Sequence, residues 1–213
     1  VYYNNAGTWE LQQILQETPP VASQLIGTCS FLDTSGLMAF VGGSGNSGKV
    51  LVFTRDGTEW TLEDTLTAEN PANGAGDSFG GWNTIAYENK YLVVGASGYS
   101  GSGDTGRAIL FYNDDTSGWG QMATVVGETA KDNLGFSVSM YGTKVYIGAP
   151  GRNNAASLNG YVREYDISGK NFNYLTEFTA NDGAATDEFG RSVSISPADG
   201  DRKSTRLNSS HLV

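Results

Sequence analysis

The feature that most restricts how this chain can fold is an internal repeat of about 54 residues. Four pairs of an apolar residue and glycine follow one another at spacings of 53, 55 and 55 residues, and three pairs of small residues at spacings of 53. A fixed period of this length indicates stacked copies of one supersecondary unit. The first kind of pair is Ile26-Gly27, Phe79-Gly80, Leu134-Gly135 and Phe189-Gly190; the second is Gly42-Gly43, Gly95-Ala96 and Gly148-Ala149, the last followed by Pro150.

Each repeat contains four segments with the composition of β-strands. In the second complete repeat they are residues 80–87, 90–97, 107–112 and 119–126, where β-branched and aromatic residues alternate with polar ones. The segment 9–18 is ambiguous between helix and strand, and we predict a strand because the equivalent segments of the other repeats read as strands. The chain is therefore predicted to be all-β.

Four strands per repeat are typical of a β-propeller, in which four-stranded blades bury their faces against one another. We predict three complete blades, with a partial blade at each end. Aromatic residues in the third and fourth strands, such as Trp119 and Phe172, would fill the space between blades. The complete blades are 25–78, 79–133 and 134–188, and the partial ones are 1–24 and 189–200.

The paired small residues are predicted to lie where inner strands converge, because glycine and alanine let backbones approach closely. Glycine also supplies positive φ where a strand meets a loop. Pro150 cannot donate to a β-ladder, so it is expected just beyond a strand end.

The motifs resemble those of the FG-GAP repeat, the repeat of integrin α-subunit propellers. The resemblance rests on FGRSVSIS from Phe189, LGFSVSM from Leu134 and VYIGAP from Val145, and it extends over nearly all of residues 1–200. It implies a propeller of typically seven blades on an extracellular or membrane-anchored protein used for binding or adhesion. Seven blades would need about 380 residues at this period, so we expect roughly half a propeller, with any signal peptide or membrane span lying outside the sequence.

The resemblance also implies calcium loops in some blades, but this sequence departs from that pattern. The corresponding positions, 33–36, 88–90 and 141–144, are short turns with at most one carboxylate each. Calcium prefers several oxygen ligands from one loop. We therefore predict no cofactor or metal here, and calcium only in blades outside this sequence.

Longer loops before each apolar-glycine pair and after each small-residue pair are expected on one face of the blades, where a rigid scaffold usually presents binding residues. Asp77, Asp132 and Asp187 each stand two residues before such a pair, and Asp104 lies in a loop after one. Two interpretations stay open for these aspartates: they cap their own turns, or they bind a ligand or cation. The expected partner of this loop face is a protein or a carbohydrate.

Charge and composition exclude other functions. The net charge of −10 argues against a nucleic-acid partner. The single histidine is His211, so a Ser-His or Cys-His catalytic pair is not expected. The lone Cys29 is predicted to be a buried small apolar residue. We predict a non-catalytic extracellular binding or adhesion scaffold; the alternatives are an accessory propeller of a larger secreted enzyme and a structural stalk.

Residues 201–213 break the repeat pattern. The first eleven of them resemble the translation of a common sequencing-library adapter, so we predict that this segment is not native. His211 and the Asn208 glycosylation sequon belong to this segment.

Overall fold

The computed structural model describes residues 1–46, 48–68, 77–99, 105–151, 160–181, 187–196 and 204–207. Within these ranges the chain forms strands, turns and bends, with no helix. A membrane-spanning helix is accordingly not found in the described part of the chain. The predicted all-β class is confirmed.

Three four-stranded antiparallel sheets form the body of the molecule. In each, the strands are joined in sequence order, so each sheet is a simple meander. Sheet 1 consists of β3 (Ile26–Leu32), β4 (Met38–Gly43), β5 (Lys49–Asp56) and β6 (Glu59–Leu66); sheet 2 of β7 (Ile85–Glu88), β8 (Tyr91–Ala96), β9 (Arg107–Asp114) and β10 (Gly118–Val126); sheet 3 of β11 (Ser137–Tyr141), β12 (Lys144–Ala149), β13 (Tyr161–Asp166) and β14 (Asn173–Phe178). Each sheet therefore coincides with one predicted repeat.

A two-stranded hairpin lies at each end of this series. β1 (Tyr2–Asn5) pairs with β2 (Thr8–Leu11), and β15 (Val193–Ser196) pairs with β16 (Ser204–Leu207). β16 falls within the segment predicted to be foreign, and that prediction stays open. Sequencing the transcript across the codon for Gly200 tests it: a frame that continues into further repeats supports the prediction, and one that encodes residues 201–213 contradicts it.

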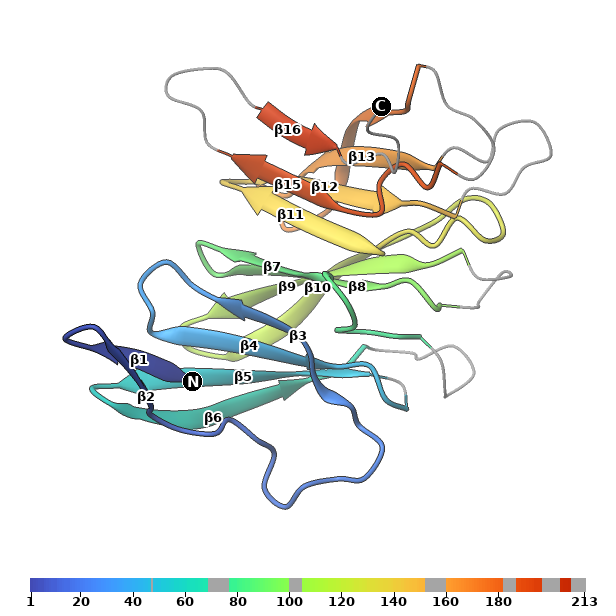
Figure 1. Ribbon diagram of the computed structural model, residues 1–213. Coiled ribbons are helices and arrows are strands. Elements are labelled where there is room, and N and C mark those ends of the chain that lie inside the picture. The colour runs from blue at the N-terminus through green and yellow to red at the C-terminus, as the bar shows by residue number, and fades with distance from the viewer. Residues whose placement is uncertain are drawn as a thin grey trace.

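The sheets follow one another face to face along the molecule (Figure 1). The first strands of consecutive sheets are in contact, β3 with β7, β7 with β11, and β11 with β15. The line of first strands is therefore the place where successive repeats meet.

Apolar side chains fill the space between neighbouring sheets. Phe40 of sheet 1 lies against sheet 2, where the Trp119 ring meets it edge-on at 5.7 Å between centroids. Between sheets 2 and 3, Phe172 packs on Tyr165 at 5.5 Å. Both predicted aromatic residues thus pack against the apolar clusters between the sheets. Cys29 is half-buried rather than buried, and it packs against the edge of the apolar cluster between sheets 1 and 2.

The segment 9–18 differs from the prediction. Its strand ends at Leu11, and the following residues cross the outer face of sheet 1 as an irregular segment. The side-chain amide of Gln13 donates to the carbonyl oxygen of Trp60 (2.8 Å) and accepts from its backbone N–H (2.8 Å). A side chain thus satisfies backbone groups of edge strand β6 that a further strand would otherwise pair.

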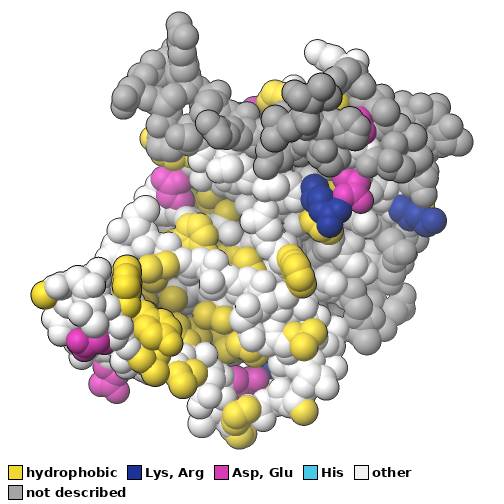
Figure 2. Space-filling model, viewed as in Figure 1, with side chains coloured by type: hydrophobic (Ala, Val, Ile, Leu, Met, Phe, Trp, Pro, Cys, Tyr) yellow, Lys and Arg dark blue, Asp and Glu magenta, His cyan; other side chains and the backbone are white. Residues whose placement is uncertain are grey.

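The N-terminal hairpin is covered little by the rest of the molecule. All eight residues of β1 and β2 are exposed, including Trp9 at 68%. Figure 2 shows hydrophobic side chains gathered at this end of the molecule. The two strands of the hairpin therefore add little to the core, whereas Val1 before them and Leu15 after them pack on the apolar cluster of sheet 1.

Asp166, at the start of the turn between β13 and β14, should make a pH-dependent contribution to the free energy of unfolding. The Ser168 backbone N–H (2.8 Å), the Ser168 hydroxyl and the Lys144 ammonium hold the pKa of Asp166 at about 2. Because the pKa is depressed in the folded state, this stabilisation is present above the unfolded pKa of about 4 and is lost as pH falls toward 2. We expect Asp166→Asn to be less stable than the wild type at pH 6 and to approach it at pH 2, measured by urea denaturation. An equal difference at both pH values would contradict this.

Candidate functional site

Three of the four apolar-glycine pairs, at Phe79, Leu134 and Phe189, lie in the same four-residue turn, whereas Ile26-Gly27 begins β3. The residue before the pair and the glycine both adopt positive φ, which glycine accommodates without steric cost. The turn closes when the N–H after the glycine donates to the carbonyl oxygen of the residue before the pair. These bonds join Gly81 to Ser78 (3.0 Å), Phe136 to Asn133 (3.1 Å) and Arg191 to Glu188 (3.0 Å). The positive φ expected of the motif glycines is found at Gly27, Gly80, Gly135 and Gly190.

The paired glycines bring consecutive sheets into backbone contact. A Cβ atom on Gly95 would lie 1.9 Å from the carbonyl oxygen of Gly135 in the next repeat. Gly135 donates its N–H to the carbonyl oxygen of Gly148 in its own repeat (3.0 Å). The same close approach recurs between Gly42 and Gly80 and between Gly148 and Gly190. The motif therefore joins each repeat to the next through backbone atoms.

The other motif residues support this junction. Phe79, Leu134 and Phe189 are buried, as are Ala96 and Ala149, whereas Ile26 is half-buried. A Cβ atom on Gly43 would meet the Ile26 side chain at 2.5 Å. Pro150 directly follows the end of β12, as predicted.

Three further glycines belong to the junctions and were missed in the sequence. Gly48, Gly106 and Gly160 form isolated parallel bridges to Phe79, Leu134 and Phe189, respectively. A Cβ atom on any of them would meet backbone atoms of that partner segment within 2.3 Å. The sequence signal that could have found them is a glycine directly before the third strand of each sheet.

Two of the four loop-face aspartates, Asp77 and Asp132, are buried in the protein. Asp77 and Asp132 are each 1% exposed. Arg107 donates to Asp77 at 2.8 Å, and the Tyr161 hydroxyl donates to Asp132 at 2.9 Å. Arg107 and Tyr161 are the first residues of the third strands of sheets 2 and 3. Lys49, the first residue of the third strand of sheet 1, forms an ion pair with Glu17 at 2.8 Å. Burial, together with the nearby Asp132 charge, raises the pKa of the Tyr161 phenol.

The capping interpretation has partial support in these contacts. Asp132 accepts the backbone N–H of Thr129 (3.0 Å), as a turn cap would. Asp77 accepts from an arginine 30 residues further along the chain. Asp187 is half-buried, and Asp104 lies outside the described residues.

The turns at the positions of the calcium loops are ordinary hairpins. Asp33 accepts the backbone N–H groups of Leu37 and Met38, both at 2.9 Å. Glu88 accepts the N–H of Gly142 from the neighbouring sheet (2.7 Å). Within the described ranges, no three His, Cys, Asp or Glu side chains cluster as metal ligands.

Two hollows, each of about 280 Å³, adjoin the glycine turns. Phe136 lines both, and we call the two adjoining hollows together the Phe136 groove. The first hollow is lined by Ser44, Ser78, Gly81, Trp82, Ser97 and Phe136. The second is lined by Asn133, Phe136, Pro150, Gly151, Glu188 and Arg191. The groove thus takes residues from four successive repeats.

The two hollows differ in charge. The first is lined, among the described residues, by aromatic side chains and serines without a charged side chain. In the second, Arg191 forms an ion pair with Glu188 and lies 5.7 Å from the centre of the Phe136 ring. The groove therefore combines aromatic surface with neutral and charged polar groups, the composition of a site for a polar ligand.

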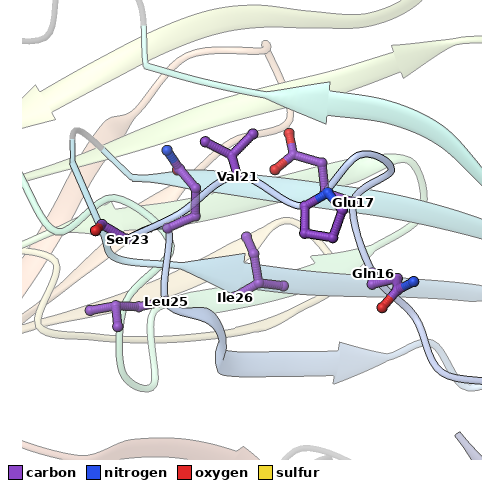
Figure 3. Close-up of a pocket in the computed structure, with 8 residues that line it drawn as sticks. Gln16, Glu17, Val21, Ser23, Leu25 and Ile26 are labelled. Atoms are coloured by element: carbon purple, nitrogen blue, oxygen red, sulfur yellow. The ribbon is translucent and has the colours of Figure 1, made fainter.

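A third hollow, of about 210 Å³, is formed by the loop that leads into β3 (Figure 3). All its lining residues come from positions 16–26. Glu17 belongs to this lining and is held by Lys49. Because one continuous segment builds this hollow, the Phe136 groove is the stronger candidate site.

A family model matches the C-terminal part of the chain. Residues 174–199 match the family model described as FG-GAP repeat. The matched segment contains most of β14, the Phe189-Gly190 turn and β15. It therefore covers one of the junctions described above.

No curated protein matches the chain. A solved structure of a hypothetical selenium-binding protein from Sulfolobus tokodaii is similar with a TM-score of 0.43 and 14% sequence identity. The match covers 69% of this chain and 39% of that one. The chain thus spans well under half of the solved protein, and a similarity at this TM-score carries no argument.

Proposed function

We propose that this chain, which carries an FG-GAP repeat at residues 174–199, is part of a β-propeller that serves as an extracellular or cell-surface binding scaffold. Three successive four-stranded meanders, each matching one sequence repeat, support the propeller arrangement. So does the contact between the first strands of neighbouring sheets, because a propeller places these strands around its axis. The glycine junctions supply the close backbone approach that such convergence requires.

The observation that carries the binding role is the Phe136 groove. It crosses several repeats, so its shape depends on how consecutive sheets are stacked rather than on one loop. Rigid scaffolds that present loop residues in this way are well suited to recognition. The groove's position beside the motif turns links the repeat architecture to the proposed function.

A non-catalytic role fits the titratable groups of this face. Asp77 and Asp132 are buried and engaged by Arg107 and Tyr161. In the groove, Glu188 is paired with Arg191. A general acid or base has to reach the substrate proton within hydrogen-bond distance, and carboxylates held in these contacts are better suited to fixing loop geometry.

Binding of fluorescently labelled protein to intact cells and extracellular material of the source organism tests the proposal. Ser97→Tyr would fill the first hollow, and we expect it to reduce saturable binding at least about tenfold, the loss of about 1.4 kcal/mol of binding free energy. Ser117→Tyr, in the exposed turn between β9 and β10, is the matched control and should bind like the wild type. The absence of saturable binding, or equal binding by both variants, would refute a binding role for this groove.

A further inference from the structure

Sheet 2 differs from its neighbours directly after the motif glycine. In sheets 1 and 3, the residue that faces the glycine of the small-residue pair, Cys29 or Ser137, follows the motif glycine by two positions. In sheet 2 the corresponding residue is Thr84, whose carbonyl oxygen accepts the N–H of Gly95 (2.8 Å), and it follows Gly80 by four positions. Two extra residues are therefore inserted at this turn, and Trp82 lies within the enlarged turn.

Hydrogen bonds hold the enlarged turn on both sides. The Thr84 hydroxyl donates to the carbonyl oxygen of Gly81 (2.9 Å). The backbone N–H of Val138, in the next repeat, donates to the carbonyl oxygen of Asn83 (3.1 Å). Asn83 has a φ of 54°, in the left-handed region. Trp82 is nevertheless 75% exposed. A fixed backbone that directs a large aromatic side chain outward is typical of irregularities that re-aim side chains beside binding sites.

The chemistry around Trp82 restricts the ligand. The first hollow combines this indole and the half-buried Phe136 ring with the hydroxyls of Ser44, Ser78 and Ser97. Among the residues that the structure describes, the lining carries no charged side chain for an ionic ligand. Serine hydroxyls beside aromatic rings favour a ligand that forms hydrogen bonds over a purely apolar one. A sugar ring satisfies both requirements, because one face presents C–H groups and its edge carries hydroxyls.

We propose that the first hollow of the Phe136 groove binds a neutral sugar residue, with the sugar ring stacked on Trp82 and its hydroxyls bonded to the serines. This inference rests on the proposed binding function and names its ligand class. The adjoining hollow, with Asn133, Glu188 and Arg191, has the polar groups to receive the next residue of an oligosaccharide. Trp82 is thus assigned as the residue that determines recognition.

A microarray of neutral oligosaccharides, ending in galactose, mannose, glucose or N-acetylglucosamine, tests this with the 213-residue chain. We expect binding to a subset of these glycans, at least about tenfold weaker binding by Trp82→Ala, and recovery to within a few-fold in Trp82→Phe. Trp9→Ala removes an equally exposed tryptophan from β2 and should bind as the wild type does. Circular dichroism would verify that all four proteins keep the same fold.

Two results would overturn the inference: no binding to any of these neutral glycans, or unchanged binding by Trp82→Ala. Cell-binding measurements separate this failure from that of the proposed function. If cell binding is lost in Ser97→Tyr but is unaffected by Trp82→Ala and by free neutral sugars, the groove binds another ligand class. If the wild type binds neither cells nor glycans, both proposals fail.

Discussion

Replacing Gly95 with alanine should lower the free energy of unfolding by about 3 kcal/mol, because the new methyl group would overlap the backbone of the next repeat. The added Cβ atom would lie 1.9 Å from the carbonyl oxygen and 2.8 Å from the carbonyl carbon of Gly135. A flexible side chain could rotate away from such a contact, but backbone atoms cannot. Relief would require sheets 2 and 3 to separate, which would open the apolar cluster between them.

Urea denaturation followed by circular dichroism measures this effect. Gly169→Ala is the matched control, since its nearest neighbour to an added Cβ atom is the Asn173 side chain at 3.9 Å. Neither Gly95 nor Gly169 has positive φ, so backbone strain does not distinguish them. We expect the control to change stability by less than about 1 kcal/mol. A similar loss in both variants would show that the glycine contact does not set the spacing of the sheets.

The sequence predicted the architecture well where local and repeated signals agreed. The alternation of polar and apolar residues placed β8 within one residue of its observed bounds, and the spacing of the glycine pairs located every junction between sheets. These predictions succeeded because the pairs have a geometric role that few residues other than glycine can fill. Their identity therefore persists from repeat to repeat and is visible in a single sequence.

The contacts that the sequence did not predict join residues that lie far apart in the chain, and the residue type at one of the two positions changes from repeat to repeat. The third-strand residue that contacts the loop carboxylate is Lys49, Arg107 or Tyr161. Because position rather than residue type is repeated there, a search for identical residues does not find it. The strand prediction for 9–18 failed for a related reason, since Gln13 satisfies β6 with its side chain.

The candidate site was the least predictable part. The sequence pattern indicated the aspartates of the loop face, two of which are buried. The groove is formed by Phe136 and by serines from separate repeats, which have no local pattern in the sequence. The insertion that carries Trp82 becomes visible only after strand pairing aligns the repeats residue by residue.

Asp77→Ala should cost about 3–5 kcal/mol, because it would leave the positive charge of Arg107 without its carboxylate in a buried position. The two side chains are 1% and 4% exposed and lie 2.8 Å apart. The Arg107 guanidinium also lies 4.3 Å from the centre of the Tyr99 ring, so it is held on more than one side and has little freedom to turn toward water. A loss of this size is a large part of the total stability of an ordinary domain.

Urea denaturation of two further variants separates charge burial from the loss of an ordinary ion pair. Asp115→Ala breaks the ion pair with Lys90, in which the Asp115 side chain is 74% exposed and the Lys90 side chain 43%. This variant should lower the free energy of unfolding by no more than about 1 kcal/mol. The double variant Asp77→Ala/Arg107→Met removes both buried charges and should be more stable than Asp77→Ala alone. If the double variant is less stable than the single one, Arg107 contributes through its packing on Tyr99 rather than through the paired charge. If Asp77→Ala costs as little as Asp115→Ala, the loop before Phe79 is held by its glycine turn and not by this ion pair.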